Sequence, residues 1–220
     1  MLLADDLLLL LTTDGDGRNT MGSMADYLLA GAVLADLALA GNIRLTEKGE
    51  QEVRANRVVV VPDAPWPSDP LLSESLTTLA KQAKWFPRTT VEKLRPHLRR
   101  TVYERLVRAE LVSRDEGRVL GLFPVTRHPA LDPRYEADLL GRLDEVLLFG
   151  REPDERVAAL IALLHAGNVL IKVVDRGRQV DRRAVKRRAK ELLDLYWTAA
   201  VTYKVIQSIQ AAAASGAAVS

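Results

Sequence analysis

Apolar residues recur at helical spacing along most of the chain, and they are densest over residues 23–40. Nearly every side of a helix drawn through this segment is apolar, from Tyr27 to Leu39. A helix that is apolar all round is usually central and buried. Gly41 follows it, and glycine commonly ends a helix because it adopts the left-handed conformation without strain. The pattern therefore predicts that residues 23–40 form the buried centre of the fold.

Further segments also carry the periodicity of helices. The first begins near the start of the chain, with Asp5 and Asp6 in its first turn, where the helix dipole favours acids. In the second, Ser73 is the expected cap, and Leu76 and Leu79 are expected to face inward. The low-complexity end, residues 211–220, is expected to fray. The predicted helices are residues 3–12, 71–84, 90–111 with a break at Pro96, 134–149, 153–166 and 178–214.

Two short regions favour antiparallel strands. Residues 43–45 and 57–62 flank a turn and predict one hairpin. A turn at residues 115–117 leads into an apolar strand at 118–123, which predicts a second. Strands and helices do not alternate as they do in parallel sheets. The fold expected over residues 1–220 is a single, mainly α domain: a central helical bundle surrounded by amphipathic helices, with one or two β-hairpins.

The amino-acid composition favours helices over strands, and it also bears on the cellular compartment in which the protein is expected. Aromatic residues make up only 5% of the chain, and cysteine is absent. The absence of cysteine excludes disulfides and thiolate zinc sites and favours a cytoplasmic protein. The first residues carry acids where a signal peptide needs positive charge, and the leucine run at 7–11 is too short to span a bilayer.

The sequence patterns of common catalytic and cofactor sites are missing. Asp14 and Asp16 suggest a calcium loop, but Asn19 and Ala25 stand where it needs glycine and glutamate. The chain has no phosphate-binding glycine loop and no nucleophile elbow. None of the three histidines has a second histidine three or four residues away, as a metal-binding helix would need. We therefore expect a binding module without a cofactor rather than an enzyme.

Charge is distributed unevenly, although the formal net charge is only +2. Residues 81–112 hold nine lysines and arginines against three acids, and residues 172–190 hold nine against two. Such zones suit an anionic partner, either nucleic acid or a membrane surface, but they also occur as solvated helix faces. In the first zone a phosphate could be chelated, because guanidinium is its preferred partner. The candidates are Arg99 and Arg100 with Arg88, Lys93 and Arg95, and Trp85 is expected at the level of the lipid headgroups.

The second candidate feature is the apolar segment 119–123, flanked by Arg114, Arg118 and Arg127. An apolar hairpin beside basic residues can insert into the lipid interface. Each basic residue near the membrane contributes roughly 1 kcal/mol, and each inserted Leu or Phe at most about 1.5–3 kcal/mol. Leu120, Leu122 and Phe123 are the expected inserting residues. The alternative is an ordinary amphipathic strand that packs on the body of the protein.

Several segments form a characteristic series along the chain. An acidic and then leucine-rich helix opens the chain, the central helix and hairpin follow, and shorter motifs continue nearly to the end. The segments are LADDLLLLL (3–11), LAGAVLADLALAG (29–41), DAP (63–65), Trp85 with Pro87, VYERL (102–106), TRHP (126–129) and LIALLHAG (160–167). Taken in order, they resemble the Golgi phosphoprotein 3 family, including its bacterial members. The alanine- and arginine-rich composition favours a bacterial source.

The resemblance implies a mostly helical fold around a central bundle. It also implies binding to phosphatidylinositol 4-phosphate, with an apolar β-hairpin touching the bilayer. The family's headgroup positions fall at Met21, Ala30, Arg100 and Tyr103, and only Arg100 keeps the family's residue. Arg99, Arg88 and Arg127 are the candidates to supply the missing charge. We therefore expect a cytoplasmic protein that associates peripherally with anionic phospholipid membranes.

Two other functions fit parts of the pattern. A basic helix at 91–111, followed by a hairpin carrying Arg114 and Arg118, has the plan of a winged helix that binds nucleic acid. A wing usually contacts phosphate through a polar tip, so the apolar segment makes a nucleic-acid partner less expected than a lipid. The third function is a protein–protein adaptor in which the hairpin joins copies into a homo-oligomer.

Overall fold

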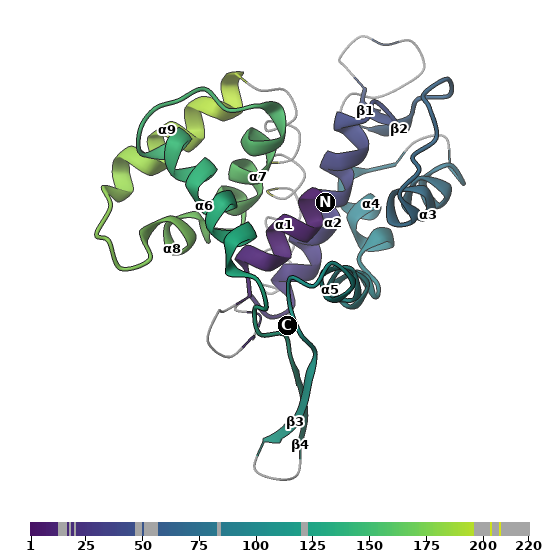
Figure 1. The fold of residues 1–220 in the computed structure, drawn as a ribbon. Coiled ribbons are helices and arrows are strands. Elements are labelled where there is room, and N and C mark those ends of the chain that lie inside the picture. The colour runs from purple at the N-terminus through teal and green to yellow at the C-terminus, as the bar shows by residue number, and fades with distance from the viewer. Residues whose placement is uncertain are drawn as a thin grey trace, which may run out of the picture.

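The structure is a computed structural model that describes residues 1–12, 17, 19, 21–46, 50, 57–82, 85–119, 123–195, 203 and 207. These residues form a mainly α fold with two small antiparallel hairpins (Figure 1). The helices are α1 (Leu3–Leu10), α2 (Met24–Leu39), α3 (Pro70–Leu79), α4 (Pro87–Leu94), α5 (Leu98–Arg108), α6 (Pro133–Leu147), α7 (Glu155–Ala166), α8 (Leu170–Asp175) and α9 (Arg182–Leu195). The strands are β1 (Ile43–Leu45), β2 (Val58–Val60), β3 (Asp115–Val119) and β4 (Phe123–Arg127).

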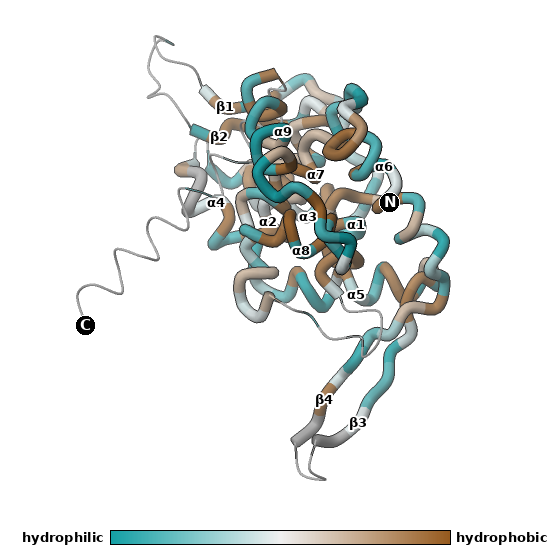
Figure 2. Tube along the Cα trace, turned by 90° about the vertical axis from the view of Figure 1, so that its left-hand side faces the viewer, coloured by the Kyte–Doolittle hydropathy of each residue, from teal (hydrophilic) through white to brown (hydrophobic). Residues whose placement is uncertain are grey.

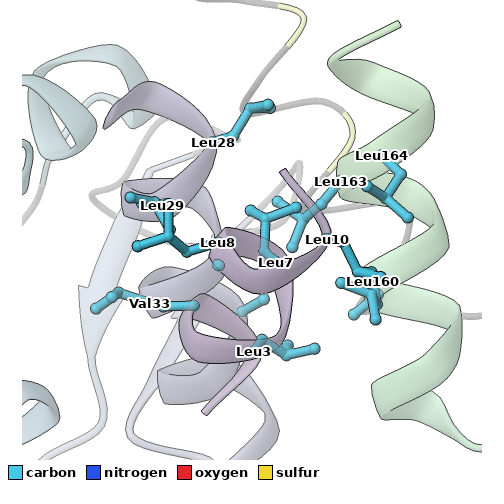
Figure 3. Close-up of a cluster of buried hydrophobic side chains, with 14 of the residues drawn as sticks. Leu3, Leu7, Leu8, Leu10, Leu28, Leu29, Val33, Leu160, Leu163 and Leu164 are labelled. Atoms are coloured by element: carbon cyan, nitrogen blue, oxygen red, sulfur yellow. The ribbon is translucent and has the colours of Figure 1, made fainter. Parts of the chain in front are cut away.

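Three apolar helices meet at the centre of the fold. Every residue of α1 is buried, and α2 and α7 are buried along most of their length. Figure 3 shows leucines of α1, among them Leu3 and Leu7, packed between side chains of α2 and α7. The predicted central helix is confirmed as α2. It ends where expected, because Gly41 adopts the left-handed conformation with φ of +72°.

The other helices cover two sides of this centre (Figure 1). Helices α6, α8 and α9 pack with α7 on one side, and α3, α4 and α5 pack against α2 on the other. The hairpin β1–β2 lies at one end of the molecule. The hairpin β3–β4 extends away from the body at the other end, which leaves its two strands without a covering layer.

Helix boundaries follow local signals, with two corrections. The break at Pro96 is confirmed, since α4 ends at Leu94 and α5 begins at Leu98. The cap of α3 is Asp69, whose side chain accepts from the first backbone N–H groups, and not Ser73, which lies inside the helix. The last helix does not begin at residue 178: the short helix α8, which was not predicted, precedes it, and α9 starts at Arg182. The expected frayed tail at 211–220 lies outside the described residues.

The second hairpin is confirmed, but its predicted turn is wrong. Asp115, Glu116 and Gly117 belong to β3 and pair with Arg127, Thr126 and Val125 of β4. Residues 120–122, between the two strands in the sequence, lie outside the described part of the chain. An Asp-Glu-Gly sequence resembles a turn locally, whereas its pairing with β4 places it within a strand.

Buried ion pairs tie α1 to the surrounding helices. Asp5 is fully buried, and both of its carboxylate oxygens accept from Arg105 of α5, at 2.8 and 3.0 Å. Arg105 also contacts the cap residue Asp69 at 3.0 Å. Asp6 accepts from Arg156 of α7 and from the Tyr135 hydroxyl of α6, both at 2.6 Å. The pairs of Arg105 fix the position of α5, whose outer face forms the candidate site.

Asp36 of α2 completes this network and titrates near neutral pH. Its carboxylate accepts from the backbone N–H of Leu3 at 2.8 Å and lies 3.3 Å from Arg156. Burial raises the pKa of Asp36 to about 7, and Arg156 and the Leu3 N–H only partly oppose this rise. Because the folded protein holds this proton more tightly than the unfolded chain, Asp36 stabilises the fold at low pH. That contribution is lost as the pH rises to about 7.

Substitution Asp36→Asn is expected to remove this dependence on pH. The free energy of unfolding of the wild type should fall relative to that of the variant between about pH 4 and pH 7, by at most about 1.4 kcal/mol per pH unit. The difference should level off about one pH unit above the pKa of Asp36, which is about 7. Chemical denaturation of both proteins from pH 5 to pH 8 measures it. A difference that does not change over this range would contradict the assigned pKa.

Candidate functional site: a cationic cleft at the base of the hairpin

A surface cleft of about 1050 Å³ lies along the outer face of α5. The first turn of α2, the corner between α4 and α5, and the base of the hairpin β3–β4 complete its walls. The cleft therefore joins segments that are far apart in the sequence. Its lining consists of Asp26, Arg95, Pro96, His97, Arg99, Arg100, Tyr103, Glu104, Val107, Arg108, Arg114, Thr126 and His128.

Positive charge predominates in this lining, with five arginines against Asp26 and Glu104. Arg99 forms a two-point pair with Asp26, at 2.8 Å through Nε and 2.5 Å through Nη2. Arg100 donates through Nε to Glu104 at 2.8 Å, one helical turn further along α5. The excess of guanidinium groups attracts anions, and phosphate is the anion whose geometry suits them best.

The arginines of the cleft differ in whether they already form salt bridges with carboxylates of the protein. Within the part of the chain that the structure describes, no salt bridge involves Arg95 or Arg108. The guanidinium of Arg95 lies over the ring of Tyr27, 4.6 Å from its centre. Arg114, directly before β3, pairs with Glu116 of that strand at 2.7 Å. Arg95 and Arg108 are therefore ready to contact a ligand without first losing a carboxylate partner of the described chain.

A stacked pair of rings forms the floor of the cleft. The rings of Tyr103 and His128 lie 3.6 Å apart and almost parallel. The Tyr103 hydroxyl is hydrogen-bonded to Thr12 at 3.0 Å, which connects the floor to the end of α1. Burial, and then the charge of Arg114, lower the pKa of His128. His128 is therefore neutral at pH 7, and the arginines carry the positive charge of the site.

Gly17 holds the backbone of His128 in place. Its carbonyl accepts from the His128 N–H at 2.9 Å, and its φ is +59°. A Cβ atom at this position would lie 2.4 Å from the backbone carbon of His128. Only glycine allows this close approach, because backbone atoms cannot move aside as a flexible side chain can.

Substitution Gly17→Ala is expected to destabilise the fold by roughly 2–5 kcal/mol, through backbone strain and overpacking. The free energy of unfolding from chemical denaturation measures the effect. The matched control is Gly141→Ala on α6, where a Cβ would meet nothing within 4 Å. That change should stabilise the helix by about 0.5–1 kcal/mol. A Gly17→Ala protein as stable as the wild type would contradict the close approach.

Of the arginines that the sequence predicted as phosphate ligands, only some line the cleft. Arg99 and Arg100 are brought together on the wall of the cleft. Arg127, the last residue of β4, does not line it, whereas its neighbours Thr126 and His128 do, because successive residues of an extended chain face opposite sides. Arg88 is the second residue of α4, and its side chain lies outside the described part of the structure.

The prediction that Trp85 sits at headgroup level is wrong. Its side chain is only 7% exposed, and its Nε1–H donates to the carbonyl of Leu79 at 2.8 Å. Its backbone forms a bridge with Val58 of β2. Basic neighbours in the sequence suggested a surface aromatic, whereas the indole packs in the core with its one donor satisfied.

The structure does not test the predicted inserting residues. Leu120 and Leu122 fall outside the described residues, as does the side chain of Phe123. The described strands β3 and β4 extend away from the body of the protein, and the cleft lies at their base (Figures 1 and 2).

Sequence reasoning missed several residues of the cleft. Glu104 and Arg108 follow Arg100 at i+4 and i+8, which places all three on one face of α5, and this signal was available. Asp26 and His128 gave no such signal. They reach the site only because the fold brings the first turn of α2 and the end of β4 beside α5.

The second basic zone lies on another face of the molecule. Along α9, Val185, Ala189 and Leu192 face the core, and the opposite side carries exposed cations. Figure 2 shows α9 on the face toward the viewer, while the hairpin projects below. The exposed cations of this α9 face are Arg182, Arg183, Lys186, Arg187 and Lys190. None of them lines the cleft.

Fold and site together define a mainly α domain with an anion-attracting cleft at the base of a projecting β-hairpin. No helix among the described residues combines the length and apolar character needed to cross a membrane. The family model of Golgi phosphoprotein 3 (GPP34) matches residues 3–209. The chain therefore belongs to the Golgi phosphoprotein 3 family, as the sequence motifs suggested. Membership is consistent with a lipid-binding module.

Proposed function

We propose that this protein is a peripheral membrane-binding module, without enzymatic activity, that holds the phosphate of an anionic lipid headgroup in its cationic cleft. The observation that carries the proposal is the convergence of five arginines at the base of a projecting hairpin. The preferred ligand is a phosphoinositide of the phosphatidylinositol 4-phosphate type. The location that follows is the cytoplasmic side of a membrane.

The cleft and the hairpin contribute different kinds of binding energy. Each arginine near an anionic surface contributes about 1 kcal/mol, and this attraction weakens as salt screens it. Leu120, Leu122 and Phe123 add up to about 1.5–3 kcal/mol each if they enter the lipid interface. Neither part alone holds a protein firmly on a bilayer, so the proposal requires both.

This chain departs from the family at three headgroup positions, and the cleft suggests how it compensates. Ala30 is fully buried in α2, and Met21 packs against the core. Tyr103 forms the floor of the cleft instead of supplying a charge. Arg95 and Arg108 are positioned to provide the missing charge around Arg100. We therefore expect phosphate binding to persist with a changed set of arginines.

Vesicle flotation tests the proposal. The wild-type protein should float with phosphatidylcholine vesicles that contain phosphatidylinositol 4-phosphate and should remain unbound with pure phosphatidylcholine vesicles. Vesicles with phosphatidylglycerol at the same charge density separate headgroup recognition from general attraction. No binding to any anionic vesicle would refute the proposal.

Two further measurements address the alternative functions. Retention of duplex DNA with a steep dependence on salt, in a protein that ignores vesicles, would favour nucleic-acid binding. Sedimentation as an oligomer without lipid, abolished by polar residues in the hairpin, would favour the adaptor.

A further inference from the structure

The centre of the cationic cluster already contains an anion. Glu104 lies on the outer face of α5, between Arg100 one turn before it and Arg108 one turn after it. Its carboxylate accepts from Arg100 Nε at 2.8 Å. Arg100, and then Arg108 and Arg114, lower the pKa of Glu104, so its carboxylate is charged at neutral pH. One carboxylate thus faces arginines from both α5 and the base of the hairpin.

We propose that Glu104 is a resident counter-anion that competes with the ligand for the arginines of the cleft. Its carboxylate occupies the place to which these arginines draw a phosphate, so a headgroup must displace it from Arg100 and bind beside its negative charge. The inference rests on the proposed function and specifies what limits affinity at the same site.

The fold does not need this ion pair. The side chains of Arg100 and Glu104 are 79% and 41% exposed, and an exposed pair at i, i+4 contributes little to stability. The buried pairs of Arg105 with Asp5 and Asp69 already fix the position of α5. A negative charge at the centre of a cationic cleft therefore acts mainly on whatever binds there.

The consequence is a site that binds weakly by itself. The lining would hold only one acid, Asp26, if Glu104 were uncharged. With Glu104 in place, headgroup binding must be supplemented by the apolar end of the hairpin. The protein would then stay only on surfaces that offer both a phosphate and an accessible lipid interface.

The test compares vesicle affinities of Glu104→Gln and Glu104→Ala with that of the wild type. The matched control is Glu74→Gln, which makes the same charge change at an exposed position of α3 outside the cleft. The probe is phosphatidylcholine vesicles containing phosphatidylinositol 4-phosphate. Both Glu104 variants should bind about three- to tenfold more tightly, because ligand repulsion and the competing pair are removed, and the control should change little.

The two Glu104 variants separate competition from positioning. Glutamine can still accept from Arg100, whereas alanine cannot, so a positioning role predicts weaker binding by Glu104→Ala. Weaker binding by Glu104→Ala, or a change no larger than that of Glu74→Gln, would overturn the inference while leaving the proposed function intact. If neither the wild type nor the variants bind these vesicles above the phosphatidylcholine background, the proposed function fails and the inference fails with it.

Discussion

Substitution Asp5→Asn is expected to lower the free energy of unfolding by about 3–5 kcal/mol, although it only replaces one carboxylate oxygen by an amide group. The carboxylate is fully buried and makes a two-point pair with Arg105, and it also accepts from the backbone N–H of Leu2 at 2.8 Å. Asparagine keeps the shape but replaces the charged partner of the largely buried Arg105 guanidinium by a neutral amide, so that Asp69 is its one remaining carboxylate partner among the described residues. Chemical denaturation at constant pH measures the loss.

The matched control for Asp5 is Asp138→Asn on α6. Asp138 pairs with Arg142 at 3.0 Å, but both side chains are more than half exposed. Its substitution should change stability by no more than about 0.5 kcal/mol. If Asp5→Asn is as mild as this control, the buried pairs do not hold α1 and α5 together as described.

The double charge reversal Arg100→Glu/Arg108→Glu is expected to weaken vesicle binding at least a hundredfold. Both residues lie on one face of α5, and reversing them turns a cleft with an excess of three positive charges into one with an excess of negative charge. At about 1 kcal/mol for each unit of charge near an anionic surface, the loss is roughly 4 kcal/mol. Flotation with phosphatidylinositol 4-phosphate vesicles measures the change.

The same reversal on α9 provides the control for the cleft. Arg183→Glu/Lys186→Glu alters the net charge of the protein by the same amount on a face that does not include the cleft. This variant should retain most of its binding, with a modest loss from long-range attraction. Equal losses in the two double variants would show that general charge, and not the cleft, draws the protein to the membrane.

Much of the fold could be predicted from periodicity because its core consists of helices with strong local signals. The all-round apolar pattern of α2 and the glycine after it give both its burial and its end. Local signals failed where long-range contacts decide the structure. Gly117 is in a strand because β4 pairs with it, and the six-residue helix α8 is too short to show a period.

The site could be predicted only in part for the same reason. Arg99 and Arg100 could be predicted because both are basic residues of a helical segment in a basic zone, and both line the cleft. Asp26 comes from α2, and His128 follows β4, and their place in the cleft depends on how the chain returns to α5. Trp85 misled the prediction because its neighbours are basic, whereas its own contacts lie in the core.

The most direct test of a phosphate-binding cleft is a crystal structure of the protein with a short-chain phosphatidylinositol 4-phosphate. We predict that a phosphate of the ligand lies within hydrogen-bonding distance of Arg100 and of at least one other arginine of the cleft, with Glu104 displaced from Arg100. A ligand bound along the cationic face of α9, with the cleft unchanged and the Arg100–Glu104 pair intact, would contradict the account.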